Sequence, residues 1–151
     1  MKYKSAFLLF FLAPIEVLAQ HHCPAIDSIK QSALIYTAVT VGGEEWSGAL
    51  HGPIPENKTD ITGFSEAFLI IDSDSDKGNA IDQGIFQKCT YNILAEGKKL
   101  DMYYGNKTWL ASISGKPHWA YQQTPFLETY RCAGVAAEEC KFDILAPNMA
   151  P

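Results

Sequence analysis

The sequence predicts an all-β fold: an antiparallel β-sandwich or a small barrel that is cross-linked by disulfides. Apolar and polar residues alternate with period 2 in many short segments, which is typical of half-buried strands. Glycine-containing turns separate most of these segments, and four cysteines follow an N-terminal leader. The chain has 151 residues, of which 47 % are hydrophobic and 19 % charged, and this fits one globular domain.

Residues 1–19 are expected to be a signal peptide. Lys2 and Lys4 precede a short apolar stretch at residues 5–13, and residues 17–19 (VLA) place small side chains where a signal peptidase cleaves. The apolar stretch is shorter than the roughly 20 residues that cross a bilayer. We therefore expect a secreted or periplasmic protein that does not span a membrane.

Residues 20–145 are expected to form a single β-rich domain, followed by a frayed tail at residues 146–151. The formal charge is −5, from 12 basic and 17 acidic residues, which argues against a nucleic-acid partner. We expect a monomer.

The mature chain opens with its one segment of helical character. Residues 24–31 (PAIDSIKQ) start with a proline, which favours the first turn of a helix, and they place Ile26 and Ile29 on one side. We therefore expect one short N-terminal helix.

The remaining chain is predicted to form about eight short strands. A polar loop at residues 52–63, which contains two prolines, separates the second strand from the third. The spacing of roughly 8–20 residues is typical of an antiparallel sandwich or barrel. The predicted strands are residues 33–41, 46–51, 67–72, 85–95, 99–104, 108–113, 126–132 and 140–145.

Cys23, Cys89, Cys132 and Cys140 all follow the leader, and an even number of cysteines in an exported chain predicts two disulfides. Three pairings are possible, and no Cys-x-x-Cys motif indicates a redox or zinc site. A hairpin or a single helical turn closes the short stretch between Cys132 and Cys140. We therefore favour Cys132–Cys140 and, by elimination, Cys23–Cys89.

Short motifs in the first two thirds of the mature chain suggest a family. They are Cys23-Pro24, Trp46-x-Gly48, Phe64-Ser65-x-Ala67 and Gly84-x-x-x-x-Cys89-x-Tyr91. With these motifs the chain resembles a family of small exported proteins of gram-negative bacteria that is known only as a domain of unknown function. Some members occur in host-invading species, so the resemblance implies a secreted, β-rich and virulence-associated protein. It supplies no catalytic residues.

Asp72, Asp74 and Asp76 alternate along the chain and precede Gly78, a pattern that suits a calcium-binding loop. An EF-hand is excluded because Lys77 stands where that loop needs glycine and the bidentate glutamate is absent. The sequence therefore predicts either a weak calcium site or a solvated hairpin loop. No other cofactor is expected.

His21 and His22 form a second candidate metal site, for copper or nickel. Cleavage after Ala19 places His22 third in the mature chain, where an amine, two amides and an imidazole make a square-planar nitrogen set. Cleavage that instead exposes His21 would let its amine and imidazole chelate copper. The alternative is an exposed polar leader without a ligand.

Trp119 and Tyr121 lie in a polar segment, residues 114–125 (SGKPHWAYQQTP), and are predicted to be an exposed aromatic pair that binds a partner. The alternative is that both pack in the core.

Three functions remain open. The first is a non-enzymatic binding protein that recognises a protein or a glycan outside the producing cell, including in a host. The second is a small secreted hydrolase whose catalytic residues come from separated loops, with His51 or His118 as the base. The third is a calcium-stabilised structural or adhesion module. No catalytic residue is identified.

Overall fold

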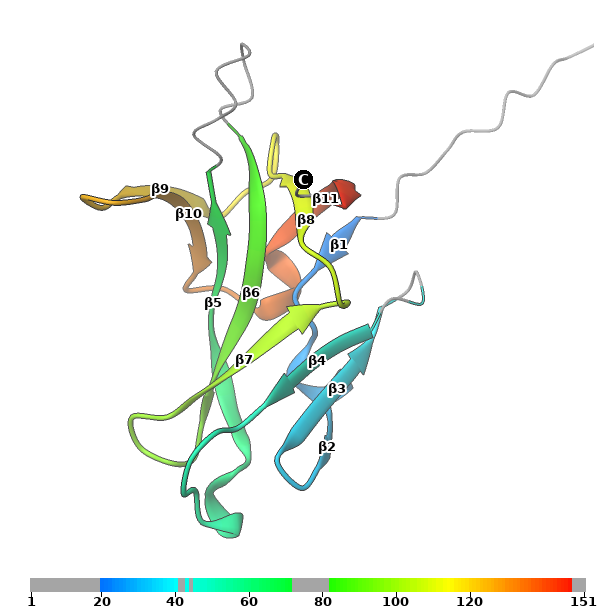
Figure 1. The fold of residues 1–151 in the computed structure, drawn as a ribbon, viewed down its shortest axis with the longest axis vertical. Helices are drawn as coiled ribbons and strands as arrows, with labels where there is room; N and C mark the ends of the chain where they lie inside the picture. Colours follow the sequence, from blue (N-terminus) through cyan, green and yellow to red (C-terminus); the bar gives the residue numbers. More distant parts are fainter. Residues whose placement is uncertain (1–19, 41–42, 44, 72–81, 148–151) are drawn as a thin grey trace, which may run out of the picture.

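The computed structural model describes residues 20–40, 43, 45–71 and 82–147. Within these ranges the chain is all-β and forms one antiparallel, 11-stranded sheet that curls into a half-barrel (Figure 1). The strands are β1 (His21–His22), β2 (Lys30–Ser32), β3 (Ile35–Val39), β4 (Glu45–Ala49), β5 (Ile61–Ile70), β6 (Gln83–Ile93), β7 (Lys99–Tyr104), β8 (Trp109–Ser112), β9 (Trp119–Gln123), β10 (Glu128–Ala133) and β11 (Lys141–Pro147).

The long strand β6 is the point at which the sheet forks. One edge of β6 pairs with β5, which continues the sheet to β10 and β9. The other edge pairs with β7 near the end of the strand and with β8 near its start, so two branches leave it. One branch runs through β7, β4 and β3 to β2, and the other runs through β8 and β11 to β1.

The core lies on the inner face of the curled sheet. Trp46 is 1 % exposed and packs against three rings from three other strands. Its ring centroid lies 5.1 Å from that of Tyr104, 5.8 Å from that of Phe86 and 6.4 Å from that of Phe142. Because Phe142 belongs to β11 and Tyr104 to β7, this cluster joins the two branches of the sheet through buried aromatic surface.

Period-2 alternation explains which side chains reach that core. In β7, Leu100, Met102 and Tyr104 are buried, whereas the residues between them face the opposite, outer face of the sheet. The outer face of β3, β4 and β7 is not covered by another layer of described residues. Ile35, Val39 and Tyr103 are exposed on this face.

Both predicted disulfides are present. Cys23–Cys89 ties the N-terminal segment to β6, with 5.8 Å between the Cα atoms. Cys132–Cys140 closes the short loop between β10 and β11, with a Cα separation of 5.7 Å. All four sulfur atoms are buried within the core.

The predicted N-terminal helix is wrong. Residues 24–31 contain only one 3-10 turn, Ile26–Ser28, closed by hydrogen bonds from Ser28 N to Ala25 O and from Ile29 N to Ile26 O. The chain then becomes extended at Ile29 and enters β2, where Lys30 pairs with Thr37 of β3. An eight-residue helix is marginal on its own, and strand pairing outweighs it.

The all-β class and the antiparallel pairing are confirmed, but the strands differ in number and length. β5 begins at Ile61, within the predicted loop, and β9 lies within the segment predicted to be polar loop. β11 extends to Pro147, so the first residues of the predicted tail are part of the sheet, and residues 148–151 lie outside the described ranges.

Candidate binding groove

The outer face of the sheet is hollowed above β3, β4 and β7. The hollow has a volume of about 500 Å³, and we call it the outer groove. It is lined by Ile35, Ser47, Gly48, Ala49, His51, Lys99, Asp101 and Tyr103. A volume of this size holds a small ligand.

The groove exists because the outward residues of β4 are small while those of its neighbours are large. Ser47 pairs with Tyr103 of β7, and Ala49 pairs with Ile35 of β3. Tyr103 is 50 % exposed and Ile35 is 57 % exposed, so both stand above a floor of short side chains. The result is one apolar and one aromatic wall on either side of β4.

Asp101 is held in a fixed position at the groove by two neighbours on β6. Lys88 Nζ lies 2.6 Å from Asp101 Oδ2, and Thr90 Oγ1 donates to Asp101 Oδ1 at 2.7 Å. Thr90 is the cross-strand partner of Asp101 on the outer face, and Lys88 is its diagonal neighbour two residues away on β6. The two carboxylate oxygens are therefore already hydrogen-bonded, and the side chain is pre-organised.

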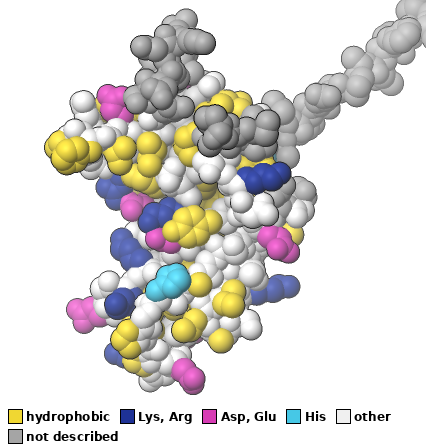
Figure 2. Space-filling view, in the orientation of Figure 1, with side chains coloured by type: hydrophobic (Ala, Val, Ile, Leu, Met, Phe, Trp, Pro, Cys, Tyr) yellow, Lys and Arg dark blue, Asp and Glu magenta, His cyan; other side chains and the backbone are white. Residues whose placement is uncertain are grey.

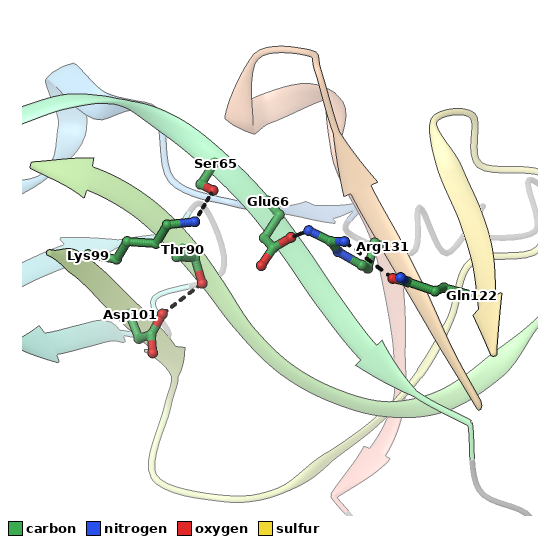
Figure 3. Close-up of polar contacts among 7 residues, drawn as sticks. All are labelled: Ser65, Glu66, Thr90, Lys99, Asp101, Gln122 and Arg131. Atoms are coloured by element: carbon green, nitrogen blue, oxygen red, sulfur yellow. Dashed lines mark hydrogen bonds and ion pairs between the residues drawn. The ribbon is translucent and has the colours of Figure 1, made fainter. Parts of the chain in front are cut away.

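The same row of polar side chains continues across the sheet away from the groove (Figure 3). Glu66 on β5 forms an ion pair with Arg131 on β10, and Arg131 Nη1 donates to Gln122 Oε1 on β9 at 3.2 Å. Figure 2 shows acidic and basic side chains lying next to one another on this face, with a histidine and hydrophobic side chains nearby. Glu66 and Asp101 thus each have a cation beside them.

Lys99 differs from the other cations of this row. Its Nζ donates to Ser65 Oγ at 3.0 Å, a neutral partner (Figure 3), and no carboxylate in the described chain forms an ion pair with it. The groove therefore carries a positive charge that is not neutralised locally, although the protein is acidic overall with a formal charge of −5.

The structure brings His51 into the groove, on the same lining as Asp101. His51 makes no hydrogen bond to another described residue, and both oxygens of Asp101 are engaged elsewhere. Among the described residues, His51 and Asp101 therefore do not form a hydrogen-bonded pair. His118 is exposed, lies outside the groove just before β9, and has a positive φ of 74°.

Trp119 and Tyr121 both lie on β9, but they differ in exposure. Trp119 is half-buried and its Nε1 donates to Lys141 O at 2.8 Å, which ties β9 to β11. Tyr121 is 51 % exposed and donates its hydroxyl hydrogen to Glu128 Oε1 at 2.8 Å. Partner binding by this pair stays a prediction.

His21 and His22 lie on β1, where they pair with Phe142 and Lys141 of β11. The ring of His21 stacks on that of Phe142 with 5.9 Å between centroids, and its Nδ1 lies 3.2 Å from the hydroxyl of Tyr104. His22 Nδ1 lies 2.8 Å from Cys23 O. The two imidazoles thus contact different parts of the fold.

Asp72, Asp74 and Asp76 lie outside the described residues. Within the described residues, no group of three or more His, Cys, Asp or Glu side chains is arranged to hold a metal ion.

Lys99, Asp101 and Tyr103 line the groove although the sequence did not predict them as site residues. The signal was present, because the alternation in KLDMYY that places Leu100 in the core also turns Lys99 and Asp101 outward. What the sequence did not contain was the identity of the neighbouring strands, which determines that these side chains stand beside the small residues of β4.

The fold and the groove define a small disulfide-linked all-β protein with a ligand-sized hollow on the open face of its sheet. The chain belongs to the family described as protein of unknown function (DUF3757), whose model matches residues 18–143. The resemblance to a family of unknown function is therefore confirmed. No curated protein and no solved structure matches the chain. None of the helical turns in the described ranges is long and apolar enough to cross a membrane.

Proposed function

We propose that this protein is an exported, monomeric, non-enzymatic binding protein that recognises a saccharide in the outer groove. The observation that carries the proposal is the half-exposed ring of Tyr103 standing beside the fixed carboxylate of Asp101, above a floor of small side chains. An aromatic ring packs against the apolar face of a sugar, and charged side chains exchange hydrogen bonds with its hydroxyl groups.

The size of the groove favours a saccharide over a folded protein as its ligand. Stable protein–protein interfaces bury about 800 Å² on each partner and place an apolar cluster at the centre. A hollow of about 500 Å³ with Asp101, Lys99 and His51 in its lining matches a small polar ligand better.

The two disulfides of the chain support its export. Disulfides form and persist in oxidising compartments, and this chain has two of them. Residues 1–19 have the features of a signal peptide, and the family match begins at residue 18, beside the expected cleavage point. We therefore place the protein in the periplasm or outside the producing cell, where glycans of a host or of other cells are accessible.

The proposal is tested by applying the mature protein to an array of neutral and acidic oligosaccharides and titrating the saccharides that bind by calorimetry. Tyr103→Ala is expected to weaken the binding roughly tenfold, because it removes the stacking surface. Tyr121→Ala is the matched control, since Tyr121 has similar exposure but lies on β9, outside the groove.

Two results would overturn the proposal. One is that no saccharide binds the wild-type protein. The other is that Tyr103→Ala and Tyr121→Ala weaken binding equally, which places the site elsewhere.

A further inference from the structure

A second hollow, built from other residues, lies between the N-terminal segment and the loop closed by Cys132–Cys140. Its volume is about 480 Å³, and we call it the N-terminal groove. Ile26, Phe64 and Val135 are the large apolar side chains of its lining, and Asp27 and Glu138 contribute carboxylates to the same lining. All five side chains are exposed or half-buried, so the groove is open to solvent.

Both walls of this groove are rigid. Cys23–Cys89 anchors the segment that leads to Ile26, and Ser28 Oγ donates to Ala25 O at 2.7 Å within the same turn. On the other side, the disulfide closes the loop, and Ala136 N donates to Glu139 Oε2 at 3.2 Å. Because the groove is already held in one conformation, it loses little conformational entropy when a ligand binds, and this favours a higher affinity.

The two carboxylates of this lining have no partner within the described part of the chain. Neither Asp27 nor Glu138 makes a hydrogen bond or an ion pair there, in contrast with Glu66 and Asp101 on the outer face. Burial first, and then the charge of Glu138, raises the pKa of Tyr91, so the charge of Glu138 acts on a neighbouring side chain of the fold. Two carboxylates without a partner among the described residues thus line the same hollow as Ile26, Phe64 and Val135.

We propose that the N-terminal groove binds a segment of a partner protein in which an apolar side chain is flanked by lysine or arginine. The apolar side chain packs against Ile26, Phe64 and Val135, and the flanking cations pair with Asp27 and Glu138. The formal charge of −5 adds a long-range attraction for a basic segment. This interaction does not depend on saccharide binding in the outer groove.

The proposal is tested with three peptides added to the ¹⁵N-labelled mature protein, with amide shifts followed by NMR. The central residues of the peptides are Lys-Leu-Lys, Lys-Ser-Lys and Glu-Leu-Glu, each flanked by glycines. Lys-Leu-Lys is expected to bind in the roughly millimolar range and to shift amides near residues 26–27, 64 and 135–138. Lys-Ser-Lys should bind several-fold more weakly, and Glu-Leu-Glu should cause no saturable shift.

Asp27→Asn combined with Glu138→Gln should weaken the binding of Lys-Leu-Lys roughly tenfold, because each exposed pair contributes modestly. Glu56→Gln combined with Glu96→Gln is the matched control, since both glutamates are exposed and neither lines the N-terminal groove. Thermal unfolding of each variant verifies that it is folded.

The proposal is overturned if Lys-Leu-Lys causes no saturable shift, or if its shifts map outside the N-terminal groove. It is also overturned if Lys-Ser-Lys binds as tightly as Lys-Leu-Lys, because the groove would then recognise positive charge without the apolar side chain. Equal binding by the double variant and the control variant would overturn it as well.

Discussion

Lys99 lines the outer groove with its Nζ beside Ser65 Oγ, and no carboxylate of the described chain forms an ion pair with it. A saccharide that carries a carboxylate or sulfate supplies the missing partner, so acidic saccharides are expected to bind more tightly than neutral ones. Lys99→Gln should weaken binding of an acidic oligosaccharide about fivefold and leave binding of its neutral counterpart unchanged. Calorimetric titration of both ligands checks this, and equal losses for the two would refute the role of the charge.

Gly48 lies where β4 passes close to β7. A Cβ atom at this position would collide with the backbone carbonyl oxygen of Asp101 and press on Leu100 and Met102. Gly48→Ala is therefore expected to lower the free energy of unfolding by about 1–3 kcal/mol. Gly63→Ala is the matched control, because nothing lies closer than 4.0 Å to its Cβ position and alanine suits a strand better than glycine. The free energies of unfolding of the two variants are measured in urea. Equal values would show that a side chain at Gly48 does not disturb the packing of β4 on β7.

Tyr91 gives the fold a dependence on alkaline pH. Its buried hydroxyl donates to Pro24 O at 2.6 Å, and burial, then the charge of Glu138, raises its pKa above the usual value. In the unfolded chain a tyrosine loses its proton near pH 10, while the folded state retains it. The contribution to stability is therefore complete below about pH 10 and decreases as the pH rises further.

Above about pH 10 the free energy of unfolding should therefore decrease less steeply with pH in Tyr91→Phe than in the wild type. The two slopes should differ by at most roughly 1.4 kcal/mol per pH unit. The free energy of unfolding of the wild type and the variant is measured in urea from neutral to strongly alkaline pH. The variant should be less stable at neutral pH, because it lacks the hydrogen bond to Pro24. Parallel curves for the two proteins would show that Tyr91 does not titrate as described.

At the scale of elements, the two disulfides constrain loops of very different length. Cys23–Cys89 spans 66 residues and Cys132–Cys140 spans 8. By loop entropy the first stabilises the fold by about 4 kcal/mol and the second by about 2.5 kcal/mol. Replacing both cysteines of the long loop with alanine should therefore lower the melting temperature more than replacing both cysteines of the short loop. The reverse order, measured by calorimetry, would contradict the entropic account.

Three of the four motifs that carry the family resemblance hold the fold together in this chain. Trp46 centres the aromatic core and Gly48 permits the close approach of β4 to β7. Cys89 and Tyr91 attach β6 to the Cys23-Pro24 segment, through the disulfide and through the hydrogen bond to Pro24 O. This explains how the motifs indicate a fold without indicating an activity.

How much the sequence reveals differs between elements. The alternation over residues 99–104 predicts β7 with the bounds Lys99–Tyr104, because one face of that strand packs on the core. β2 and β9 are exposed along most of their length and lie at ends of the sheet, so neither carries the apolar alternation of a half-buried strand. Their strand structure comes from pairing with β3 and β10, which no local pattern encodes.

At the scale of the whole molecule, the fork at β6 produces the candidate site. Phe142 of β11 packs against Trp46 on the inner face, whereas the outer groove lies on the other face of β7, β4 and β3. The disulfides were predictable from the even number of cysteines, whereas the groove depends on which strands become neighbours. Local sequence patterns do not indicate which strands pair, because strands that are neighbours in the sheet are distant along the chain.

If the outer groove is the ligand site, a saccharide that binds the protein must shift the backbone amides of the residues that line this groove. The mature ¹⁵N-labelled protein is titrated with that saccharide. Saturable shifts concentrated at residues 35, 47–51 and 99–103 are expected, and in Tyr103→Ala the same shifts should saturate only at roughly tenfold higher saccharide concentration. Shifts concentrated on β9, at the N-terminal groove or in residues 72–81 instead would show that the ligand site lies elsewhere.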